Sequence, residues 1–422
     1  MEISDFEDIL HFLYHRPNSR GGKWKLDRVI KLFERLEIRQ PPYKVIHIAG
    51  TNGKGSTSAM LESIYRHGGY KTGLLTSPHL ISLLERIQID GHLISKENFV
   101  QTFQIVHAIA ENLKQETPED VITFFEYMTA IALRYFLEKK VDVAVIEVGL
   151  GGRLDATNAL KNTSCSVITT VAFDHEETLG HTLPAIAREK AGIIRPHGLV
   201  VTGYGIQGEV IETIQDVAQA QGAELHSSQR NHPFDTTTAD YQNYNASTAQ
   251  TAAELLNNKG ILPIPNAKIL EGIQQFRWPG RWQKIVYQGK TVIFDGAHNE
   301  EGAYAVAREI QNLPQPPTLI FGSNTVQRAQ KMLAILSPIC KKIYFTQSTF
   351  YVHPTLHSLD ATELYGCCPS SIVPHRVGNI RLENIAQFIE TLPEETLVVT
   401  GSLYLIGDLM RILVHQCHEI LV

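Results

Sequence analysis

An unbroken apolar run, VDVAVIEVG at 141–149, constrains the fold of this chain more than any other feature. A strand that is buried on both faces of a parallel sheet is apolar throughout, whereas a strand with one solvated face alternates. A second such run at 44–49 is followed by a Gly-rich turn and by apolar positions at helical spacing, which predict a helix from Ser56 to His67. We therefore expect parallel strands that are connected through helices.

The same alternation continues along all 422 residues, a length that at roughly 100–200 residues per domain predicts two or three domains. We expect an α/β fold of two domains, both with doubly wound parallel sheets, divided between 285 and 286 beside the turn signal at 287–290. Further strands are expected at 71–77, 166–174, 198–203, 291–299, 317–323, 341–347 and 395–402, and further helices at 123–140, 184–192 and 303–313.

Composition excludes several classes of protein. Lys plus Arg number 38 and Asp plus Glu 44, so the formal charge is 38 − 44 = −6, which argues against a protein that coats nucleic acid. No apolar run reaches the ~20 residues of a membrane span, and the start MEISDFEDIL lacks the basic and apolar regions of a signal peptide. The five cysteines show no C-x-x-C spacing. We expect a cytoplasmic protein with no nucleic-acid or membrane partner.

The segment 50–57, GTNGKGST, is a candidate phosphate-binding loop between the strand at 44–49 and the following helix. Glycines let backbone N–H groups converge on phosphate oxygens, the helix N-terminus adds a favourable dipole, and Lys54 adds a charge. The strict G-x-x-x-x-G-K-[ST] pattern fails, because Ile48 replaces its first Gly and Gly55 follows Lys54. The plainer interpretation is a connecting turn. We expect Gly55 to have a positive φ or to lie close to the nucleotide.

Other candidate residues also lie at or just after the ends of predicted strands, where ligands bind in such folds. A carboxylate at the place of Glu147 suits a hard cation such as Mg²⁺, although a solvated carboxylate is the plainer interpretation. Each remaining candidate also has a plainer interpretation: a turn for Ser77, a structural imidazole for His175, a surface lysine for Lys190, a solvated cation for Arg281, and an Asx-turn that caps a helix for 295–299.

Taken together, the motifs resemble those of one family. They are HIAGTNGKGST, TSPHL, TFFEY, EVGLGGRLDATN, AFDH followed by REKAGI, PGRW, FDGAHN and TGSLYLIGD. Their order resembles that of folylpolyglutamate synthases and dihydrofolate synthases, which belong to the ATP-dependent Mur ligase superfamily. The resemblance implies an N-terminal P-loop ATPase domain with a mainly parallel sheet and a pterin site at 1–285. It also implies a C-terminal Rossmann-like glutamate-ligase domain at 286–422.

The resemblance also implies a role for each matching residue. Contacts with ATP would come from Gly53, Lys54, Gly55, Ser56, Asn245, Arg281 and Asp295. Two Mg²⁺ ions would be held by Ser56, Ser77, Glu147 and His175, with a monovalent cation as a further candidate cofactor. The pterin site would be lined by Thr123, Phe124, Phe125, Glu126, Leu154, Asp155 and Ala156. Lys190 would carry a carbamate, and His298 and Ser402 would position glutamate. The catalytic residues would be Lys54, Lys190, Asp295 and His298.

The expected function is an ATP-dependent amide ligase that adds L-glutamate to a reduced folate or dihydropteroate. The reaction would proceed through an acyl phosphate and release ADP and phosphate, and the enzyme would be a monomer. Two segments depart from the family pattern. Gly322 is followed by SNTVQRAQ where a D-K-D-like run is usual, and 347–358 lacks a Pro-Arg pair. Two alternatives stay open: another amino-acid ligase of the superfamily, and a nucleotide-binding regulatory protein without ligase activity.

Overall fold

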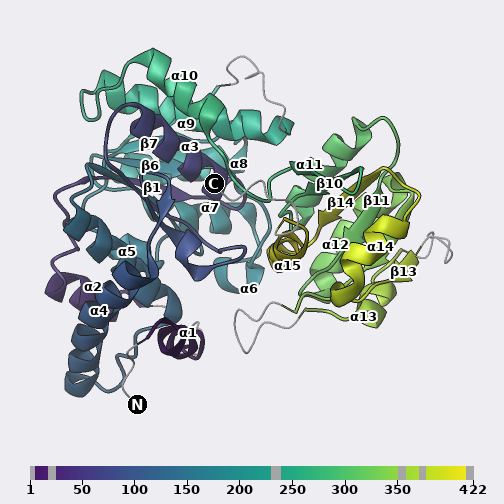
Figure 1. Ribbon diagram of the computed structural model, residues 1–422. Coiled ribbons are helices and arrows are strands. Elements are labelled where there is room, and N and C mark those ends of the chain that lie inside the picture. Colours follow the sequence, from purple (N-terminus) through teal and green to yellow (C-terminus); the bar gives the residue numbers. More distant parts are fainter. Residues whose placement is uncertain (1–4, 18–24, 230–238, 350–357, 370–376, 415–422) are drawn as a thin grey trace. The chain divides into compact units, whose positions relative to one another are not determined.

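The computed structural model describes residues 5–17, 25–229, 239–349, 358–369 and 377–414. The chain forms two compact α/β units (Figure 1). The first comprises Met1–His79, Leu83–Thr236 and Gln242–Arg277, and the second comprises Leu80–Ser82, Thr237–Tyr241 and Trp278–Val422. The second unit thus includes two short segments that precede its main part in the sequence. The expected α/β fold is confirmed in both units.

The first unit is built on an eight-stranded sheet with the order β4-β3-β2-β5-β1-β6-β7-β8. All neighbours are parallel except at one edge, where β3 runs antiparallel to both β2 and β4. The strands are β1 (Lys44–Ala49), β2 (Thr72–Leu75), β3 (Ile87–Ile89), β4 (His92–Leu93), β5 (Val143–Glu147), β6 (Cys165–Ile168), β7 (Leu199–Thr202) and β8 (Glu224–Ser227). The apolar strand β5 lies between β2 and β1 and is buried along its whole length, as its sequence predicts.

Helices cover this sheet. They are α1 (Phe6–Tyr14), α2 (Asp27–Arg35), α3 (Lys54–His67), α4 (Lys96–Glu116), α5 (Phe124–Lys139), α6 (Glu176–Leu179), α7 (Leu183–Ala191), α8 (Glu209–Ala220), α9 (Asp240–Asn258) and α10 (Asn266–Gln275), with 3-10 helices η1 (Leu83–Arg86) and η2 (Ala156–Ala159). The largest core forms where α1, α2, α4 and α5 pack on β1, β2 and β5. A smaller core lies between α7, α8 and the strands β6 and β7.

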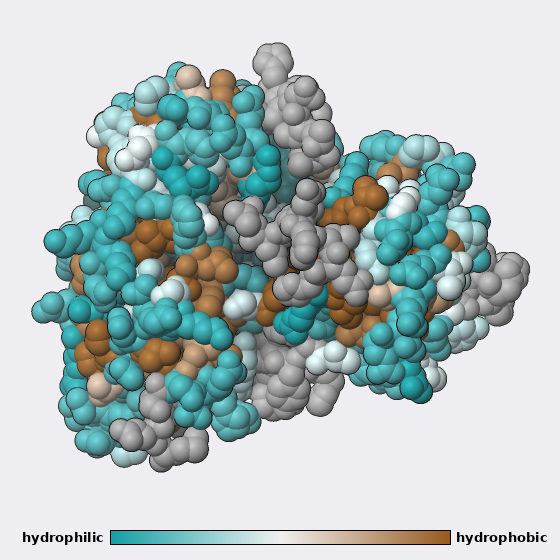
Figure 2. All heavy atoms as spheres, viewed as in Figure 1, coloured by the Kyte–Doolittle hydropathy of each residue, from teal (hydrophilic) through white to brown (hydrophobic). Residues whose placement is uncertain are grey.

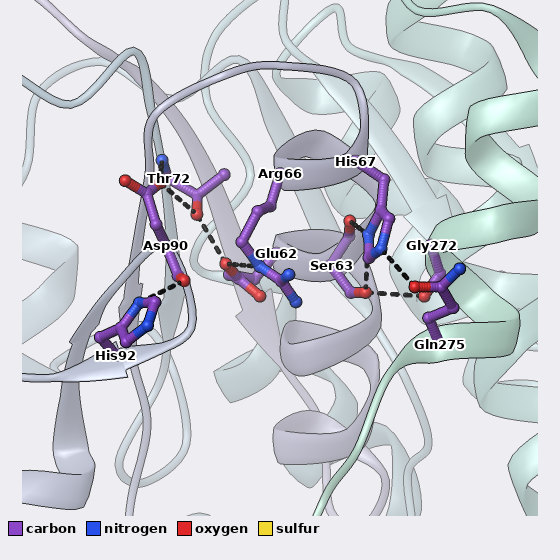
Figure 3. Close-up of polar contacts among 9 residues, drawn as sticks. All are labelled: Glu62, Ser63, Arg66, His67, Thr72, Asp90, His92, Gly272 and Gln275. Atoms are coloured by element: carbon purple, nitrogen blue, oxygen red, sulfur yellow. Dashed lines mark hydrogen bonds and ion pairs between the residues drawn. The ribbon is translucent and has the colours of Figure 1, made fainter. Parts of the chain in front are cut away.

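Helix α3, which begins at the candidate phosphate loop, is held from two sides (Figure 3). On one side, the buried carboxylate of Glu62 accepts hydrogen bonds from Thr72 Oγ1 at 2.6 Å and from Arg66 Nε at 3.0 Å. On the other side, Ser63 Oγ donates to the carbonyl of Gly272 in α10 at 2.7 Å. His67 Nε2 lies 2.9 Å from Gln275 Oε1. These contacts fix the helix whose N-terminus would face a phosphate.

The second unit has a six-stranded sheet with the order β13-β12-β11-β14-β10-β9, in which only β9 is antiparallel to its neighbour. Its strands are β9 (Gln283–Tyr287), β10 (Lys290–Phe294), β11 (Thr318–Phe321), β12 (Lys342–Phe345), β13 (Val377–Asn379) and β14 (Thr396–Thr400). One core packs α11 (Glu300–Gln311), α12 (Val326–Leu336) and α13 (Ala361–Gly366) on the sheet, and another packs α14 (Ile385–Thr391) and α15 (Leu403–Val414). Two 3-10 helices, η3 (Ser337–Ile339) and η5 (Leu382–Asn384), complete the described elements.

Two local expectations differ from the structure. The turn at 287–290 joins β9 to β10 as a hairpin within the second sheet, with positive φ at Gln288 and Gly289, the geometry that a tight hairpin requires. The division expected between 285 and 286 therefore falls inside β9. The strand expected at 166–174 ends at Ile168, because the polar groups that follow bind the phosphate loop instead.

The face of the molecule in Figure 2 is mostly hydrophilic, with separate hydrophobic areas. Large apolar side chains that are exposed, such as Val286 and Tyr304, are spread over several elements. Among the described residues, no helix has the length and apolar character that crossing a bilayer requires.

The close packing of α10 on α3 gives a first prediction. A Cβ at Gly272 would lie 2.4 Å from the Cα of Ile64. Although Ala favours a helix over Gly by about 1 kcal/mol, Gly272→Ala should lower the free energy of unfolding of the first unit by about 1–3 kcal/mol through overpacking. Urea denaturation checks this. Gly366→Ala, at the end of α13 with open space around it, should not destabilise the protein. A neutral or stabilising Gly272→Ala would contradict the account.

Candidate active site

The candidate phosphate loop follows β1 and is bound by the segment that follows β6. The backbone N–H of Thr51 donates to the carbonyl of Thr170 at 2.8 Å, and that of Asn52 donates to Thr170 Oγ1 at 2.9 Å. In return, Thr169 Oγ1 donates to the Asn52 carbonyl at 2.6 Å. A Cβ at Gly50 would lie 1.9 Å from Thr169 Oγ1, so only Gly fits there. The segment after β6, the neighbour of β1 in the sheet, thus fixes the conformation of this loop.

The left-handed residue of the loop is Gly53, with φ +82°, and not Gly55, which lies in the first turn of α3. The expectation of a positive φ at Gly55 is therefore wrong. The second alternative for Gly55, proximity to the nucleotide, stays a prediction. A Cβ at Gly53 would lie 2.3 Å from Oδ1 of Asn245 in α9, so the structure brings two predicted nucleotide ligands together. Lys54 Nζ donates to the carbonyls of Gly50 and Thr51 at 3.1 and 3.0 Å.

Glu147 ends β5 beside this loop, since Ile48 of β1 is its partner in the sheet. Its side chain is 3% exposed, so the interpretation as a solvated carboxylate is excluded. Glu147 Oε2 accepts the backbone N–H of Ser77 at 2.9 Å, which brings together two of the four predicted metal ligands. Ser56, which is buried, lies in the first turn of α3. Carboxylate and hydroxyl oxygens are hard donors that fit Mg²⁺ or a similar cation.

The remaining predicted ligand, His175, lies at the N-cap of α6 with a left-handed backbone. Its side chain is 41% exposed, and its ring nitrogens lie 4.0 Å from Asp174 and 3.6 Å from Glu177. The described residues contain no cluster of three or more His, Cys, Asp or Glu side chains suited to a metal ion. A cation held here would therefore depend on a mixed set of protein oxygens and imidazole, completed by oxygens from a ligand.

Lys190 is buried, with 3% of its surface exposed, so the interpretation as a surface lysine is excluded. The end of its helix, α7, packs directly on the loop after β5. A Cβ at Gly152 would lie 2.9 Å from the Lys190 carbonyl oxygen, and the N–H of Arg153 donates to the Glu189 carbonyl at 2.8 Å. The absence of a side chain at Gly152 therefore permits this close packing of α7 on the loop.

The predicted pterin segment 123–126 forms the start of α5. Thr123 and Glu126 make a capping box, in which Glu126 Oε2 accepts the Thr123 N–H at 2.8 Å. Arg28 of α2 also binds this carboxylate, with Nε 2.9 Å from both oxygens. Glu126 is 6% exposed as a residue, and its carboxylate is occupied by protein donors, which favours a role in shaping the site. Nothing in the sequence pairs Arg28 with residue 126, so sequence reasoning missed it.

The two aromatic residues of this segment make different contacts. The ring of Phe124 stacks on Tyr14, with centroids 5.8 Å apart, and Arg86 lies over it at 5.2 Å. The ring of Phe125 rests on Gly149, where a Cβ would lie 2.7 Å from the ring. Because Gly149 opens the loop that leads to Leu154, Asp155 and Ala156, Phe125 connects the two predicted pterin segments.

Asp155 organises that loop from within. Its Oδ2 accepts the N–H groups of Gly149 and Leu150 at 3.1 and 3.0 Å, and its Oδ1 accepts the Thr157 hydroxyl at 2.6 Å. The Thr157 oxygen lies 2.8 Å from His47 Nε2 on β1. Burial raises the pKa of Asp155, although these hydrogen bonds oppose the shift. Burial, assisted by Arg195, lowers the pKa of His47 to about 3. The signal that could have pointed to His47 is one polar residue in an otherwise apolar run, VIHIA.

In the second unit, Asp295 follows β10 and is 2% exposed. Its Oδ2 accepts the Tyr241 hydroxyl at 2.5 Å and the Trp282 N–H at 3.0 Å, and its Oδ1 accepts the Ala297 N–H at 2.9 Å. Burial raises the pKa of Asp295, whereas the nearby Arg281 guanidinium opposes the shift. Tyr241 was missed, since no motif relates it to Asp295. The expected Asx-turn is present, and Asn299 caps α11.

Three loops converge at the carboxyl edge of the second sheet. The carbonyl of Ala297 accepts the Gly401 N–H at 3.0 Å, and Ser402 Oγ donates to Asn324 Oδ1 at 3.1 Å. His298 Nδ1 lies 2.9 Å from the Gly296 carbonyl, so Nδ1 carries the proton in that contact. The divergent segment after Gly322 thus contributes Asn324 beside Ser402. In the other divergent segment, 350–357 lie outside the described residues.

Comparison with known proteins identifies the family. Residues 48–263 match the profile of the Mur ligase middle domain, and residues 280–412 match that of the dihydrofolate synthetase C-terminal domain. The dihydrofolate synthase/folylpolyglutamate synthase of Bacillus subtilis is 32% identical over 421 residues, covering 93% of this chain and 95% of that protein. This chain belongs to the folylpolyglutamate synthase/dihydrofolate synthase family.

Solved structures of this family agree over the full length. The Escherichia coli FolC protein in complex with DHPP and ADP has a TM-score of 0.84 at 27% identity, covering 99% of each chain. A bifunctional folylpolyglutamate synthase/dihydrofolate synthase with Mn, AMPPNP and L-glutamate bound has a TM-score of 0.82 at 28% identity, covering 98% of each. The expected family, fold class and enzyme class, a ligase that forms carbon–nitrogen bonds, are confirmed.

The buried imidazole of this family member gives a second prediction. The pKa of His47 falls from 6.5 to about 3 on folding. Between these values the unfolded chain binds a proton that the folded chain does not, so stability is lost as the pH falls from about 6.5 towards 3. The difference in unfolding free energy between the wild type and His47→Gln should shrink over this window when measured by urea denaturation. A difference that is independent of pH would show that His47 is not buried as the neutral form.

Proposed function

We propose that this chain couples ATP hydrolysis to the joining of L-glutamate to a folate-type carboxylic acid, dihydropteroate among them. The observation that carries the proposal is the arrangement at the carboxyl ends of β1, β5 and β6. There the phosphate loop, the buried Glu147 and the loop contacted by Phe125 lie beside one another. The match of residues 280–412 to the dihydrofolate synthetase C-terminal domain supports dihydropteroate as an acceptor.

The reaction needs an activated acyl group, because an amine does not attack a carboxylate at a useful rate. We propose that a carboxylate oxygen of the acceptor attacks the γ-phosphorus of ATP and that the bond to the ADP oxygen breaks. The neutral amine of glutamate then attacks the acyl phosphate carbon, loses a proton, and phosphate leaves. Gly53, Gly55 and Ser56 would donate hydrogen bonds to the phosphates, and the Lys54 ammonium would offset their charge.

Ser56, Ser77, Glu147 and His175 are the residues that would hold Mg²⁺, two ions by the family pattern, with a monovalent cation as a further candidate. A structural relative contains Mn with AMPPNP, and this supports a divalent ion. When bound, such an ion would neutralise charge on the phosphate oxygens. The Ser77 N–H contributes by orienting the Glu147 carboxylate. We propose that Lys190, buried beside the loop after β5, reacts as the neutral amine with CO₂ and loses a proton to give a carbamate.

The remaining assignments follow the family. Asn245, Arg281 and Asp295 would contact ATP. Leu154, Ala156 and the start of α5 would contact the pterin, whereas His298 and Ser402 would position glutamate. A monomeric state and a cytoplasmic location stay predictions. The divergent segment after Gly322 favours no second function, because Asn324 still supplies a polar group beside Ser402.

Product analysis tests the proposed function. With ATP, L-glutamate and dihydropteroate or a reduced folate offered separately, the chain should form ADP and phosphate in step with an acceptor whose mass increases by one glutamate. Formation of AMP and pyrophosphate would exclude the acyl-phosphate route. Nucleotide binding without any product from any acceptor would instead favour the regulatory alternative.

A pair of lysine variants completes that test. Lys54→Ala should lower kcat by about 10²–10³, the typical effect of removing one preorganised electrostatic group. The exposed Lys114→Ala, on α4, is the matched control and should keep wild-type turnover. Unchanged turnover in Lys54→Ala, with both variants folded by circular dichroism, would remove Lys54 from the site.

The carbamate gives a separate prediction. Lys190→Ala should be nearly inactive, and formate or acetate at high concentration should restore part of the turnover, because a free carboxylate can replace the carbamate. Lys190→Arg should be inactive and not restored, since its cation is permanent. Arg188→Ala, an exposed position on the same helix, is the control and should be active. If no carboxylate restores Lys190→Ala, the carbamate assignment fails.

A further inference from the structure

A buried chain of hydrogen bonds connects the middle of β1 to the loop that follows β5. It begins at His47, continues through Thr157 and ends at the carboxylate of Asp155, which holds the N–H groups of Gly149 and Leu150. His47 and Thr157 are fully buried, and Asp155 is 4% exposed. Solvent therefore does not compete for these hydrogen bonds, and each donor has one defined acceptor.

The geometry also determines where the protons lie. The Thr157 hydroxyl has a single proton, which it donates to Asp155 Oδ1 at 2.6 Å. Its oxygen can then only accept from His47, so Nε2 of His47 carries the imidazole proton. Nδ1 of His47 is buried and has no hydrogen-bond partner among the described residues. A second proton there would lack an acceptor, so the neutral ring, with its proton on Nε2, is the form that fits.

The Asp155 end of this chain of hydrogen bonds lies at the predicted acceptor side of the site. Gly149 supports the ring of Phe125, and Gly149 and Leu150 lie two and three residues after Glu147. A shift of the Gly149–Leu150 backbone would therefore move the surface beneath Phe125. The phosphate loop is held by a different set of contacts, from Thr169 and Thr170. The two halves of the site can thus be perturbed separately.

We propose that His47 and Thr157 are positioning residues for the folate-type acceptor: through Asp155 they fix the Gly149–Leu150 backbone against which Phe125 packs. This inference rests on the proposed function for the identity of the acceptor. The arrangement of the loop itself does not depend on that function, and the test has one measurement for each.

The first measurement needs no activity. The amide protons of Gly149 and Leu150 donate to Asp155, so their hydrogen exchange reports the state of the loop. Thr157→Val removes the hydroxyl at nearly constant volume, and His47→Leu removes the donor; both should speed exchange at these two amides by tenfold or more. Thr157→Ser and His47→Gln retain a hydroxyl and an N–H donor, so they should restore protection at least in part.

Ser166→Ala is the matched control. Ser166 lies opposite His47 on β6, is 1% exposed and donates one hydrogen bond to the Ile193 carbonyl at 2.9 Å. Its loss costs a buried hydrogen bond at the same depth without touching the chain that ends at Asp155. Exchange at Gly149 and Leu150 should therefore stay within twofold of the wild type. Equal acceleration in Ser166→Ala would indicate general destabilisation and overturn the proposal.

The second measurement uses steady-state kinetics. In Thr157→Val and His47→Leu, KM for the acceptor should rise about tenfold, whereas KM for ATP should stay within about twofold. The double variant should be no worse than Thr157→Val alone, because both residues act through one chain. Equal changes for acceptor and ATP would overturn the proposal. If the wild type forms no product, the proposed function fails. The exchange result still decides whether the hydrogen bonds from His47 to Asp155 fix the loop after β5.

Discussion

The hydrogen bonds between the phosphate loop and the segment after β6 are the interaction on which the rest of the first unit depends. The carbonyls of Gly50 and Thr51 accept from Lys54, and that of Asn52 accepts from Thr169. Because these oxygens are turned towards protein donors, they would not face an anion bound at the loop. The contacts that Thr169 and Thr170 make with the loop end β6 at Ile168. They also fix the start of α3, whose first-turn N–H groups have no partners within the helix.

The proposed acceptor half of the site is organised on the same principle. The carboxylates of Glu126 and Asp155 are buried, and each is occupied by donors from the protein: the Arg28 guanidinium and the Thr123 N–H in one case, and loop amides and a hydroxyl in the other. The Arg28 guanidinium also offsets the charge of the Glu126 carboxylate. The cost of burying the two carboxylates is offset by hydrogen bonds that shape the surface around Phe125.

What could be predicted from the sequence follows from the range of the interactions. Strand β1, strand β5 and the position of Glu147 were predictable because each depends on a local pattern of apolar residues and glycines. Arg28, Tyr241 and Asn324 were not, since their partners at 126, 295 and 402 are distant in the chain and share no motif with them. The turn at 287–290 was recognised correctly as a turn. Whether a turn divides domains or closes a hairpin depends on which strands pair in the sheet. The local sequence of the turn does not specify that pairing.

The central claim is that the carboxyl ends of β1, β5 and β6 bring the γ-phosphate of ATP to the acceptor carboxylate. Isotope transfer tests it most directly. With oxygen-18 in the acceptor carboxylate, the account predicts that one labelled oxygen appears in inorganic phosphate for each amide bond formed, as detected by phosphorus NMR or mass spectrometry. Product that forms with unlabelled phosphate, or with the label in AMP, would contradict phosphoryl transfer to the acceptor at this site.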